Sequence, residues 1–270
     1  MTQKIGFIGT GNLATAIIGG IVKAELVSGE NIFASDADKN RAEEIAKKYD
    51  VQVVASNKDV ARKADILFLS VKPQIYATVI KEIKSHVKQN ALVIILAAGL
   101  GIEKVAEMFS SPGLKFVKTM PNTPALVNCG MTAICAAKNV TPEEMKNVLA
   151  IFNSVGKTEI IPEHQFDVFT ALASSSPAYV FMFIEAMADA GVKLGLSRKQ
   201  AIDVSTQAIL GAAKMVQETA EHPAVLKDAV CSPGGTTIEA IQVLEQKGFR
   251  SAVIDAIHTC TKKAGTLGSQ

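Results

Sequence analysis

The stretch FIGTGNLA at residues 7–14 decides how the first half of this chain folds. Gly9, Gly11 and Ala14 match the pattern G-x-G-x-x-G/A. The pattern directly follows a segment typical of a strand and opens a helical pattern at about 12–24, which is the context that a dinucleotide-binding turn requires. Gly9 then permits the tight turn, Gly11 lets a pyrophosphate approach the backbone, and Ala14 allows close packing of helix on sheet. We therefore predict a dinucleotide site here, with a purely structural glycine turn as the alternative.

Segments typical of strands alternate with helical patterns through the first part of the chain, and only helical patterns follow residue 160. The strand-like segments lie at residues 4–9, 31–35, 51–54, 64–71, 91–97, 115–121 and 131–137. The later helices are expected at about 177–194, 197–218 and 223–230 and after the turns at 233–235 and 248–251. Alternating strands and helices indicate an α/β fold with a mostly parallel, doubly wound sheet. We predict a dinucleotide-binding Rossmann domain at 1–160 and an all-helical dimerisation and substrate-binding domain at 161–270.

The helix expected at 177–194 is apolar around nearly its whole circumference. Its charged residues Glu185, Asp189 and Lys193 form one narrow stripe with the spacing i, i+4, i+8. A helix that is apolar nearly all round is buried in the folded protein. Because so much apolar helix is hard to bury within one small domain, we predict that this domain packs against a second copy of itself. Packing on the first domain alone is the alternative.

The composition restricts the class of protein and its partners. Hydrophobic residues make up 48% of the chain and charged residues 20%, so a sizeable core can be buried. The net charge of +2 argues against nucleic-acid binding by bulk charge. The longest apolar runs, such as residues 91–102, are too short to span a bilayer, and the N-terminus has no signal-peptide layout. We therefore expect a cytoplasmic protein with neither a nucleic-acid nor a membrane partner.

The cysteines and histidines are scattered. They stand at Cys129, Cys135, Cys231 and Cys260 and at His86, His164, His222 and His258, without a CxxC pair or a zinc-binding spacing. The sequence therefore predicts neither a metal site nor a disulfide framework. A cysteine at a helix start has a lowered thiol pKa, and Cys231 is expected at such a position. The alternative is that Cys231 only fills space there.

A second glycine turn lies late in the chain, in VCSPGGTTIEAI at residues 230–241. The Pro-Gly-Gly step is a turn signal, and Ser or Thr before a helical pattern is a typical N-cap residue. A turn that opens a helix points several backbone N–H groups one way, at the positive end of the helix dipole, where anions bind. The expected anion is the carboxylate of a small substrate, and an ordinary helix cap is the alternative.

The residues after the second strand, ASDADKNR, bear on the choice of cofactor. Ser35 and Asp36 compete for the position that faces the adenosine ribose. An aspartate there favours the free 2′-hydroxyl of NAD. A serine with basic neighbours tolerates the 2′-phosphate of NADP, and the neighbours that would supply charge are Lys39, Arg41 and Lys58. We predict that NADPH is preferred and that NADH is the alternative.

Seven stretches together resemble the pyrroline-5-carboxylate reductase family. They are IGFIGTGNLATAIIGG (5–20), VKP (71–73), AAG (97–99), MPNTP (120–124), SPAYVF (176–181), GLSRKQA (195–201) and SPGGTTIEAI (232–241). They span nearly the whole chain, in the order in which the family has them. The resemblance implies a Rossmann domain followed by a helical domain that interlocks with a second copy, with larger rings of dimers as a further assembly. It implies NAD(P)H-dependent reduction of the cyclic imine 1-pyrroline-5-carboxylate to L-proline.

The resemblance also implies which residues form the site. Those expected at the cofactor are Ile8, Gly9, Thr10, Gly11, Asn12 and Leu13 at the pyrophosphate, Ser35 and Asn57 near the adenosine 2′ group, and Val71, Lys72, Pro73, Ala97, Ala98, Gly99 and Asn122 at the nicotinamide end. Those expected at the substrate are Glu163, Ser175, Gly234, Gly235, Thr236 and Thr237. We expect Thr237 to be the catalytic hydroxyl that hydrogen-bonds the imine nitrogen, with a buried helix-cap threonine as the alternative. Lys72 is expected to act through its backbone.

One segment departs from the family pattern. The family usually has S-G-S-G before PAY, whereas ASSSPAY at 173–179 has Ser174 and Ser176 where glycine is usual. A glycine at either position would permit a positive φ or a close approach to substrate, so we expect an altered pocket. Because of this departure, one alternative is a regulator that binds NADP but catalyses no reaction. A β-hydroxyacid-type dehydrogenase is the other alternative, although the helix that should carry its catalytic lysine offers only Lys193, near the far end.

Overall fold

A computed structural model describes residues 1–267 of the chain and divides them into two compact units. The first, here called the Rossmann unit, contains Met1–Ser175 and the described residues from Cys260 onward. The second, here called the helical unit, is Ser176–Thr259. The domain boundary predicted from the sequence lies at residue 160, whereas the compact units divide after Ser175. The difference arises because residues 163–175 pack within the Rossmann unit, where Phe166 is only 2% exposed and shares a cluster with Met120.

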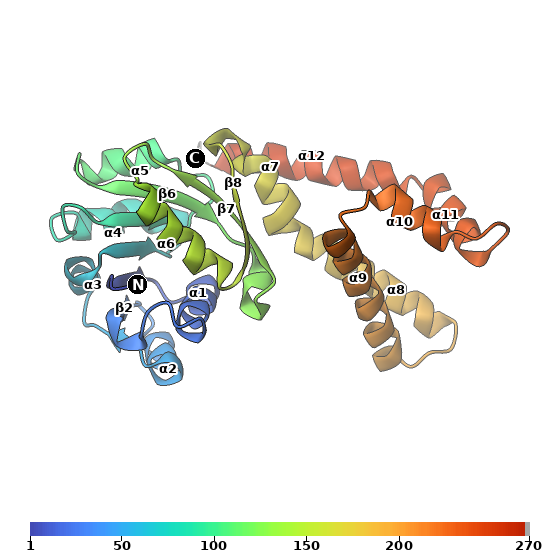
Figure 1. The fold of residues 1–270 in the computed structure, drawn as a ribbon, viewed down its shortest axis with the longest axis horizontal. Helices are drawn as coiled ribbons and strands as arrows, with labels where there is room; N and C mark the ends of the chain where they lie inside the picture. Colours follow the sequence, from blue (N-terminus) through green and yellow to red (C-terminus); the bar gives the residue numbers. More distant parts are fainter. Residues whose placement is uncertain (268–270) are drawn as a thin grey trace. The chain divides into compact units, whose positions relative to one another are not determined.

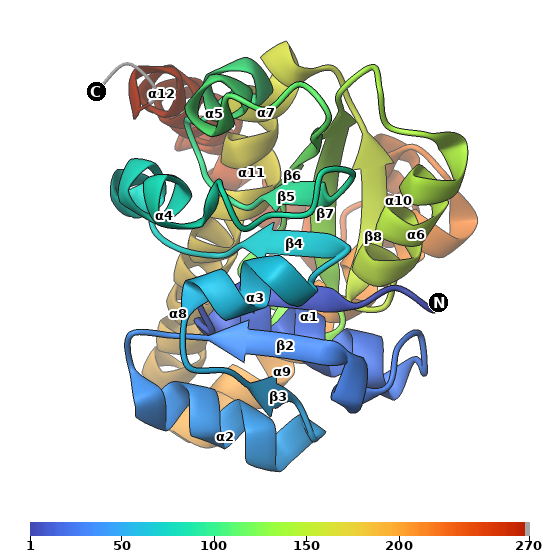
Figure 2. The same ribbon diagram turned by 90° about the vertical axis from the view of Figure 1, so that its left-hand side faces the viewer.

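The Rossmann unit contains one sheet of eight strands among its described residues (Figure 2). The strands are β1 (Ile5–Ile8), β2 (Ile32–Ser35), β3 (Gln52–Val53), β4 (Ile66–Leu69), β5 (Leu92–Ile95), β6 (Lys115–Met120), β7 (Gly130–Ala136) and β8 (Gly156–Ile160), in the spatial order β3-β2-β1-β4-β5-β6-β7-β8. Neighbouring strands are parallel except for β6 and β7, which are antiparallel. The strand order reverses between β1 and β4, and ligands of doubly wound sheets bind outside the carboxyl ends of strands at such a point.

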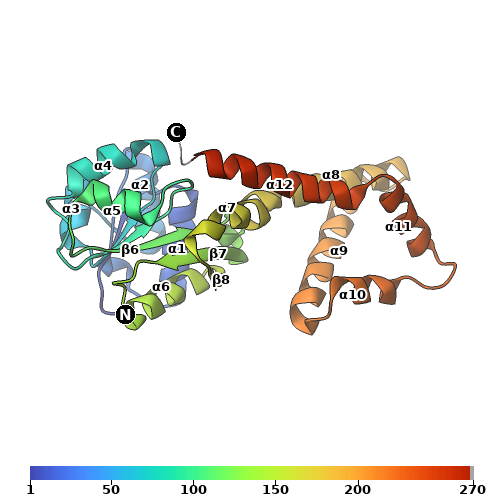
Figure 3. The same cartoon turned by 90° about the horizontal axis from the view of Figure 1, so that it is seen from above.

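Helices cover both faces of this sheet. They are α1 (Asn12–Lys23), α2 (Lys39–Tyr49), α3 (Asn57–Lys63), α4 (Tyr76–Ile83), α5 (Ile102–Phe109), α6 (Pro142–Asn153) and α7 (Phe166–Phe169), and a π-helical turn at Thr170–Ser175 follows α7. Side chains of α1, α2 and α6 pack with one face of the sheet, and side chains of α3, α4 and α5 pack with the other. Figure 3 shows α4 and α6 on opposite sides of the strands. The predicted α/β fold with a doubly wound sheet is confirmed.

Local sequence explains where most of these elements begin. All four residues of β1, β2, β4 and β5 are buried, which is why these strands read as continuous apolar runs. Asp38 accepts hydrogen bonds from the first turn of α2, and Thr141 and Glu144 form a capping box at the start of α6. Strand β8 was not predicted, because its sequence GKTEI has no apolar run and most of its residues are exposed.

The helical unit consists of α8 (Ser176–Lys193), α9 (Arg198–Thr219), α10 (Pro223–Val230), α11 (Thr236–Gln246) and the first part of α12 (Phe249–Leu267) (Figure 1). Ser197 and Gln200 form a capping box at the start of α9, which begins within one residue of the predicted start at 197. Helices α8 and α9 pack closely, since a Cβ atom added to Gly191 would lie 3.0 Å from the Cβ of Ala201. The predicted helices of this part of the chain are thus present.

In a single copy of the chain the first long helix is mostly exposed, which disfavours the alternative that it packs on the first domain alone. Of the described residues of α8, only Ala188 is buried, whereas Phe181 is 64% and Met182 73% exposed. One helical run of the described residues, Glu163–Lys193, is long and apolar enough to cross a membrane by length and composition alone, although no uninterrupted apolar run of the sequence is that long.

Candidate functional site

The turn after β1 has the geometry that the glycine pattern predicts. Gly9 has a φ of +94°, and a Cβ atom at this position would lie 2.6 Å from the carbonyl oxygen of Ser70. The Gly9 N–H donates to the carbonyl of Ser35 at 2.8 Å, which attaches the turn after β1 to the end of β2. Only glycine satisfies these restraints together. At Gly11, in contrast, an added Cβ would meet no described atom of the chain within 4 Å, so the space in front of this residue is open.

Helix α1 begins at this turn with an unfilled N-terminus. Its N-cap is Gly11, and among the described residues no side chain caps it and no acidic residue lies in its first turn. The first N–H groups of a helix have no intrahelical partner and lie at the positive end of the helix dipole, where a pyrophosphate binds well. The open space at Gly11 and these N–H groups therefore fit the diphosphate of a dinucleotide.

A cleft of about 340 Å³ lies in front of this helix end. It is lined by Gly11, Asn12, Leu13, Ala14, Arg41, Ser70, Val71, Lys72 and Leu96. The structure thus brings together predicted residues from the first turn of α1 and from the segment after β4. Arg41 was predicted only as a basic neighbour of the 2′-phosphate, and Ser70 and Leu96 are lining residues that sequence reasoning missed. Ser70 and Leu96 directly follow β4 and β5, so the rule that ligands bind at carboxyl ends of strands would have found them.

The carboxylate of Asp36 is engaged by the turn itself. Its Oδ2 atom accepts hydrogen bonds from the Thr10 backbone at 2.6 Å and the Thr10 hydroxyl at 2.8 Å, and its Oδ1 atom accepts from the Asp38 backbone at 2.9 Å. Burial disfavours the ionised form, but these hydrogen bonds and the nearby Arg41 outweigh it and hold the pKa of Asp36 below its ordinary value. Asp36 therefore braces the glycine turn.

Ser35 and Asn57, predicted near the adenosine 2′ group, are in direct contact. The Ser35 hydroxyl donates to Asn57 Oδ1 at 2.8 Å, and Asn57 Nδ2 donates to Glu82 Oε2 at 2.9 Å. Sequence reasoning missed Glu82, which lies 25 residues after Asn57 and is brought to it only by the packing of α3 on α4. The three side chains form a chain of hydrogen bonds that fixes the orientation of the Asn57 amide.

Asn122, predicted at the nicotinamide end, braces neighbouring elements in this structure. Its Nδ2 atom donates to the carbonyl of Ala173 at 2.8 Å, and its Oδ1 atom accepts from the Met131 backbone at 2.9 Å. The side chain is 8% exposed and links the start of β7 to the π-helical turn. In the same turn the Ser174 hydroxyl is buried and has no hydrogen-bond partner among residues 1–267. A cofactor contact of Asn122 stays a prediction.

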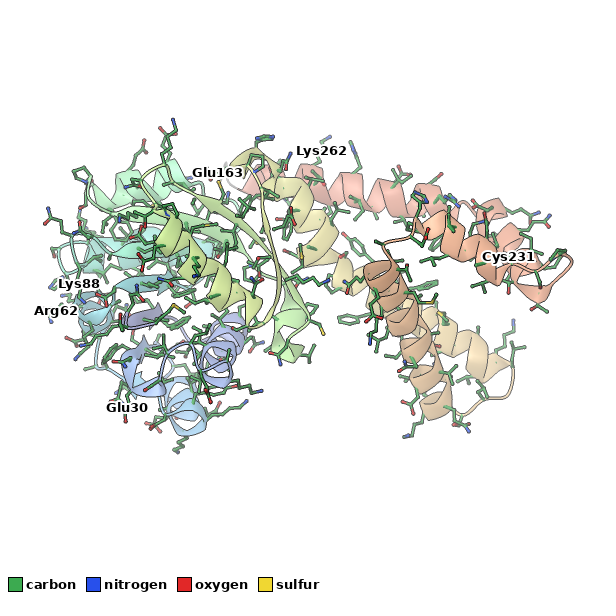
Figure 4. The ribbon with its side chains drawn as sticks, viewed as in Figure 1. Glu30, Arg62, Lys88, Glu163, Cys231 and Lys262 are labelled. Atoms are coloured by element: carbon green, nitrogen blue, oxygen red, sulfur yellow. The ribbon has the colours of Figure 1, made fainter. Side chains whose placement is uncertain are left out.

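Glu163, predicted at the substrate, lies where β8 leads into the helical run (Figure 4). Its Oε1 atom accepts a hydrogen bond from the Ile102 backbone at 2.8 Å and lies 3.3 Å from Lys118 Nζ. Burial raises the pKa of the nearby Cys135 thiol, and the Glu163 carboxylate adds to this shift. Ser175, also predicted at the substrate, ends the π-helical turn of the same unit.

The second glycine turn lies in the helical unit and opens α11. The Gly235 N–H donates to the carbonyl of Ser232 at 3.0 Å, and Gly234 has a φ of +67°. The prediction of a Ser or Thr cap is wrong, since the N-cap is Gly235 and Thr236 and Thr237 are the first helical residues. Thr237 is half-buried, and in the described part of the chain its hydroxyl makes no hydrogen bond. Its side chain is therefore not used as a cap.

Cys231 does not lie at a helix start. It follows the last residue of α10, and its N–H donates to the carbonyl of Asp228 at 3.0 Å (Figure 4). The premise for an activated thiol at this position is therefore wrong, because the turn 232–235 separates Cys231 from α11. The four cysteines are free, and among the described residues no three His, Cys, Asp or Glu side chains gather where they could hold a metal ion.

Comparisons with known proteins match this chain over its whole length. The family described as "Pyrroline-5-carboxylate reductase dimerisation" matches residues 163–267, and "NADP oxidoreductase coenzyme F420-dependent" matches residues 4–99. Pyrroline-5-carboxylate reductase of Escherichia coli (strain K12) is 46% identical over 267 residues, which cover 99% of each chain. The pyrroline carboxylate reductase structure of Plasmodium falciparum with NADP bound has a TM-score of 0.89 and 37% identity, covering 99% of this chain and 98% of that one. That of Coxiella burnetii has a TM-score of 0.92 and 32% identity, covering 99% of each.

Proposed function

Because this chain belongs to the pyrroline-5-carboxylate reductase family, we propose that it reduces 1-pyrroline-5-carboxylate to L-proline, the last step of proline synthesis. It is an NADP-dependent oxidoreductase, and the resemblance read from its motifs is confirmed. The observation that carries the proposal is the turn at Gly9–Gly11. There the fold leaves open space and unpaired helix N–H groups at the switch point of a doubly wound sheet.

The residues of the cleft have distinct roles in this proposal. The first N–H groups of α1 hold the pyrophosphate, while the hydrogen bond from the Thr10 N–H to Asp36 stabilises the turn. Lys72 and the segments after β4 and β5 line the nicotinamide end, where bound NADPH supplies the hydride that reduces the C=N bond. Positioning is the main contribution of the protein, because a well-aligned pair of reactants reacts far faster than free ones.

The turn Ser232–Gly235 and the start of α11 bind the substrate carboxylate. At Gly234 an added Cβ would meet no described atom within 4 Å, so a ligand can approach the backbone there, whereas Gly235 makes room for Ser232. The N-terminus of α11 favours an anion. Thr237 then forms one hydrogen bond with the imine nitrogen through its hydroxyl, which does not cap α11 in the described part of the chain. Glu163 and Ser175 remain candidates for the substrate side, although the Glu163 carboxylate already holds Ile102 and Lys118.

The helical unit associates with the same unit of a second copy. Residues 163–267 match the dimerisation domain of these reductases. Apolar side chains such as Phe181, Met182 and Leu194 are exposed in one copy, and exposed apolar patches of this kind mark interaction surfaces. A second copy supplies that cover without a bilayer, so the run Glu163–Lys193 is an interface helix of a cytoplasmic homodimer. A ring of dimers is the further assembly, and neither nucleic acid nor membrane is a partner.

NADPH is preferred over NADH. Asp36, the residue that would otherwise hold a free 2′-hydroxyl, has both carboxylate oxygens engaged by backbone and by Thr10. Asn57, held by Ser35 and Glu82, keeps its second amide N–H as a donor for the 2′-phosphate, and Arg41 lies on the cleft wall. Fluorescence titration with NADPH and NADH checks this, and the absence of tryptophan keeps protein emission low. If NADH binds as tightly as NADPH or more tightly, Asp36 would instead be the residue that binds the ribose 2′-hydroxyl.

A steady-state assay tests the function. We expect consumption of NADPH with 1-pyrroline-5-carboxylate and formation of an equal amount of L-proline. NADPH binding without turnover would favour the regulator. The altered segment ASSSPAY, with a Ser174 hydroxyl that has no partner among residues 1–267, is the reason to test this alternative. Turnover of a small β-hydroxyacid in place of the imine would favour the other dehydrogenase class. The likeness to the Mycobacterium tuberculosis 3-hydroxyisobutyrate dehydrogenase structure, at 14% identity, concerns the fold alone.

A further inference from the structure

We propose that the Lys118–Glu163 ion pair is a positioning device that holds the loop of residues 96–101 at the cofactor cleft. The proposal rests on the proposed function, because the position of this loop matters to catalysis only if a nicotinamide ring reacts beside it. It gives Glu163 a different role from the substrate contact that the sequence predicts. It also adds Lys118, which the sequence analysis does not single out.

The loop begins at the cleft and ends at helix α5. Leu96 lines the cleft and directly follows β5, and its N–H donates to the Tyr76 hydroxyl at 3.1 Å. Gly99 has a φ of +75°, so the chain turns there before it reaches Gly101, the N-cap of α5. The predicted nicotinamide residues Ala97, Ala98 and Gly99 thus lie between two points of attachment. Whatever fixes the start of α5 therefore fixes the far end of this loop.

Glu163 fixes the start of α5 from another part of the chain. The N-cap Gly101 has no side chain to offer, and the first helical N–H, that of Ile102, donates to Glu163 Oε1 at 2.8 Å. A carboxylate at a helix N-terminus satisfies an otherwise unpaired donor and interacts favourably with the helix dipole. Glu163 comes 61 residues after Ile102, so it replaces a local cap by a long-range one.

Lys118 holds the Glu163 carboxylate in place through an ion pair. The Lys118 side chain is only 8% exposed, its Nζ atom lies 3.3 Å from Glu163 Oε1, and the same atom lies 4.7 Å from the centre of the Phe166 ring. A buried ammonium group requires a partner, so this contact is maintained. The next residue on β6, Thr119, donates its hydroxyl to the carbonyl of Ile95 at 3.2 Å, just before the loop. Adjacent β6 residues thus hold both ends of the loop, one directly and one through Glu163.

The same strand carries a matched ion pair that serves as a control. Lys115, at the first position of β6, lies 2.7 Å from Glu144 Oε1, and Glu144 belongs to the capping box of α6. This pair is also partly buried, at 21% and 23% exposure. It lies at the amino end of β6, which is parallel to β5, whereas the cleft lies at the carboxyl ends of the strands. It therefore has the chemistry of the Lys118–Glu163 pair without the contact to the loop.

The test compares Lys118→Met and Glu163→Ala with Lys115→Met and Glu144→Ala in the full-length protein. Hydrogen exchange of residues 96–102 with NADPH bound should become about tenfold faster in the first two variants and stay unchanged in the controls. The kcat for the imine should fall about tenfold or more in the first two, because small displacements of a positioned reactant are costly, and less than about twofold in the controls. The KM for the imine and the Kd for NADPH should change less than about threefold. Lys118→Arg, which keeps the charge, should restore both readouts.

Several results would overturn the proposal. Unchanged exchange of residues 96–102 in Lys118→Met would show that the pair does not hold the loop. A rise in KM for the imine in Glu163→Ala alone, without faster exchange, would instead make Glu163 a substrate contact. Should Lys118→Met and Glu163→Ala fail to fold, Lys118→Gln and Glu163→Gln, which also remove the ion pair, are measured for the same exchange, and faster exchange of residues 96–102 is expected in both. If the wild-type protein reduces no imine, the proposed function fails, while the exchange of this segment still decides whether the pair holds the loop.

Discussion

The Rossmann unit and the helical unit differ most in how completely each buries its own apolar side chains. Ile5, Phe7 and Ile17 in the Rossmann unit are fully buried, and such residues fill both faces of its sheet. In the helical unit Phe181, Met182 and Leu194 are 64%, 73% and 85% exposed. Burial of apolar surface is the dominant favourable term in folding, so the Rossmann unit completes its core within one chain. The helical unit leaves such side chains exposed in one copy, and we propose that a second copy buries them.

Each of the two units contains a helix whose N-terminus is suited to bind an anion. Helix α1 follows the glycine N-cap Gly11, and helix α11 follows the glycine N-cap Gly235. Each helix therefore begins with backbone N–H groups that no cap side chain of its own occupies. They differ in the side chains that come next, since α11 adds the hydroxyls of Thr236 and Thr237. The first turn suits a diphosphate, and the second suits a carboxylate beside a group that needs one more hydrogen bond.

The largest effect is expected from a charge placed on the exposed face of α8. Phe181→Asp should weaken self-association at least about hundredfold, because an unpaired charge buried in an interface costs about 3–5 kcal/mol. The imine-reducing activity should fall with it. NADPH binding should persist, because the Rossmann unit is complete in one copy. Sedimentation velocity and a fluorescence titration measure the two properties on the same sample.

A matched substitution in the other unit separates this effect from a general effect of charge. Val53 on β3 is 41% exposed and belongs to the Rossmann unit. Val53→Asp should leave the sedimentation coefficient unchanged. If Phe181→Asp also sediments like the wild-type protein, the contrast between the units has no consequence for assembly.

The next effect concerns the glycine turn of the Rossmann unit. Gly11→Val should weaken NADPH binding about tenfold to a hundredfold, since its side chain would occupy the open space in front of α1. Its Tm should change little, because that space holds no described atom of the chain. Gly9→Ala is the contrasting variant, and it should lower Tm strongly through its positive φ and its contact with Ser70. Equal Tm losses in the two variants would contradict the assignment.

The effect at the second glycine turn should be smaller and should spare the cofactor. Thr237→Ala should lower kcat/KM for the imine about threefold to a hundredfold, since one hydrogen bond contributes about 0.5–1.5 kcal/mol and more to a charged group. The Kd for NADPH should hardly change, because Thr237 belongs to the helical unit. Thr237→Ser should keep most of the activity. Activity that is lost equally in Ser and Ala variants would assign the role to the methyl group.

The smallest effect is expected where the chain departs from the family pattern. Ser174→Gly with Ser176→Gly should change kcat/KM for the imine by up to about tenfold and should change stability less. Ser174→Ala is the control, because it removes the buried hydroxyl without adding backbone freedom. It should stabilise the protein by about 1 kcal/mol if that hydroxyl has no partner in solution. Unchanged kcat/KM in the double variant would make the serines neutral replacements.

The sequence predicts elements well where one physical signal dominates. Strands β1, β4 and β5 were found because burial on both faces demands continuous apolar runs. The turn at Gly9 was found because only glycine meets its φ and its contact with Ser70. Strand β8 lacks such a signal, since it is held by pairing with β7 rather than by an apolar pattern.

Contacts between distant residues explain what sequence reasoning missed. Glu82 reaches Asn57 only through the packing of helices, and Glu163 reaches Ile102 across 61 residues. The cap of α11 was misassigned because Ser232, Gly235 and Thr236 are all acceptable cap residues, and the turn geometry chooses among them. The exposure of α8 could not be read from its composition, since an apolar helix looks the same whether its own chain or a second copy covers it.

Active-enzyme sedimentation tests most directly whether the helical unit works only when a second copy completes it. The protein is layered at low micromolar concentration over a solution of NADPH and 1-pyrroline-5-carboxylate, and the loss of NADPH absorbance is followed as it moves. We predict that the moving boundary has the sedimentation coefficient of a dimer or a larger assembly of the 28.5 kDa chain. Oxidation of NADPH that travels with a folded monomer would contradict this prediction.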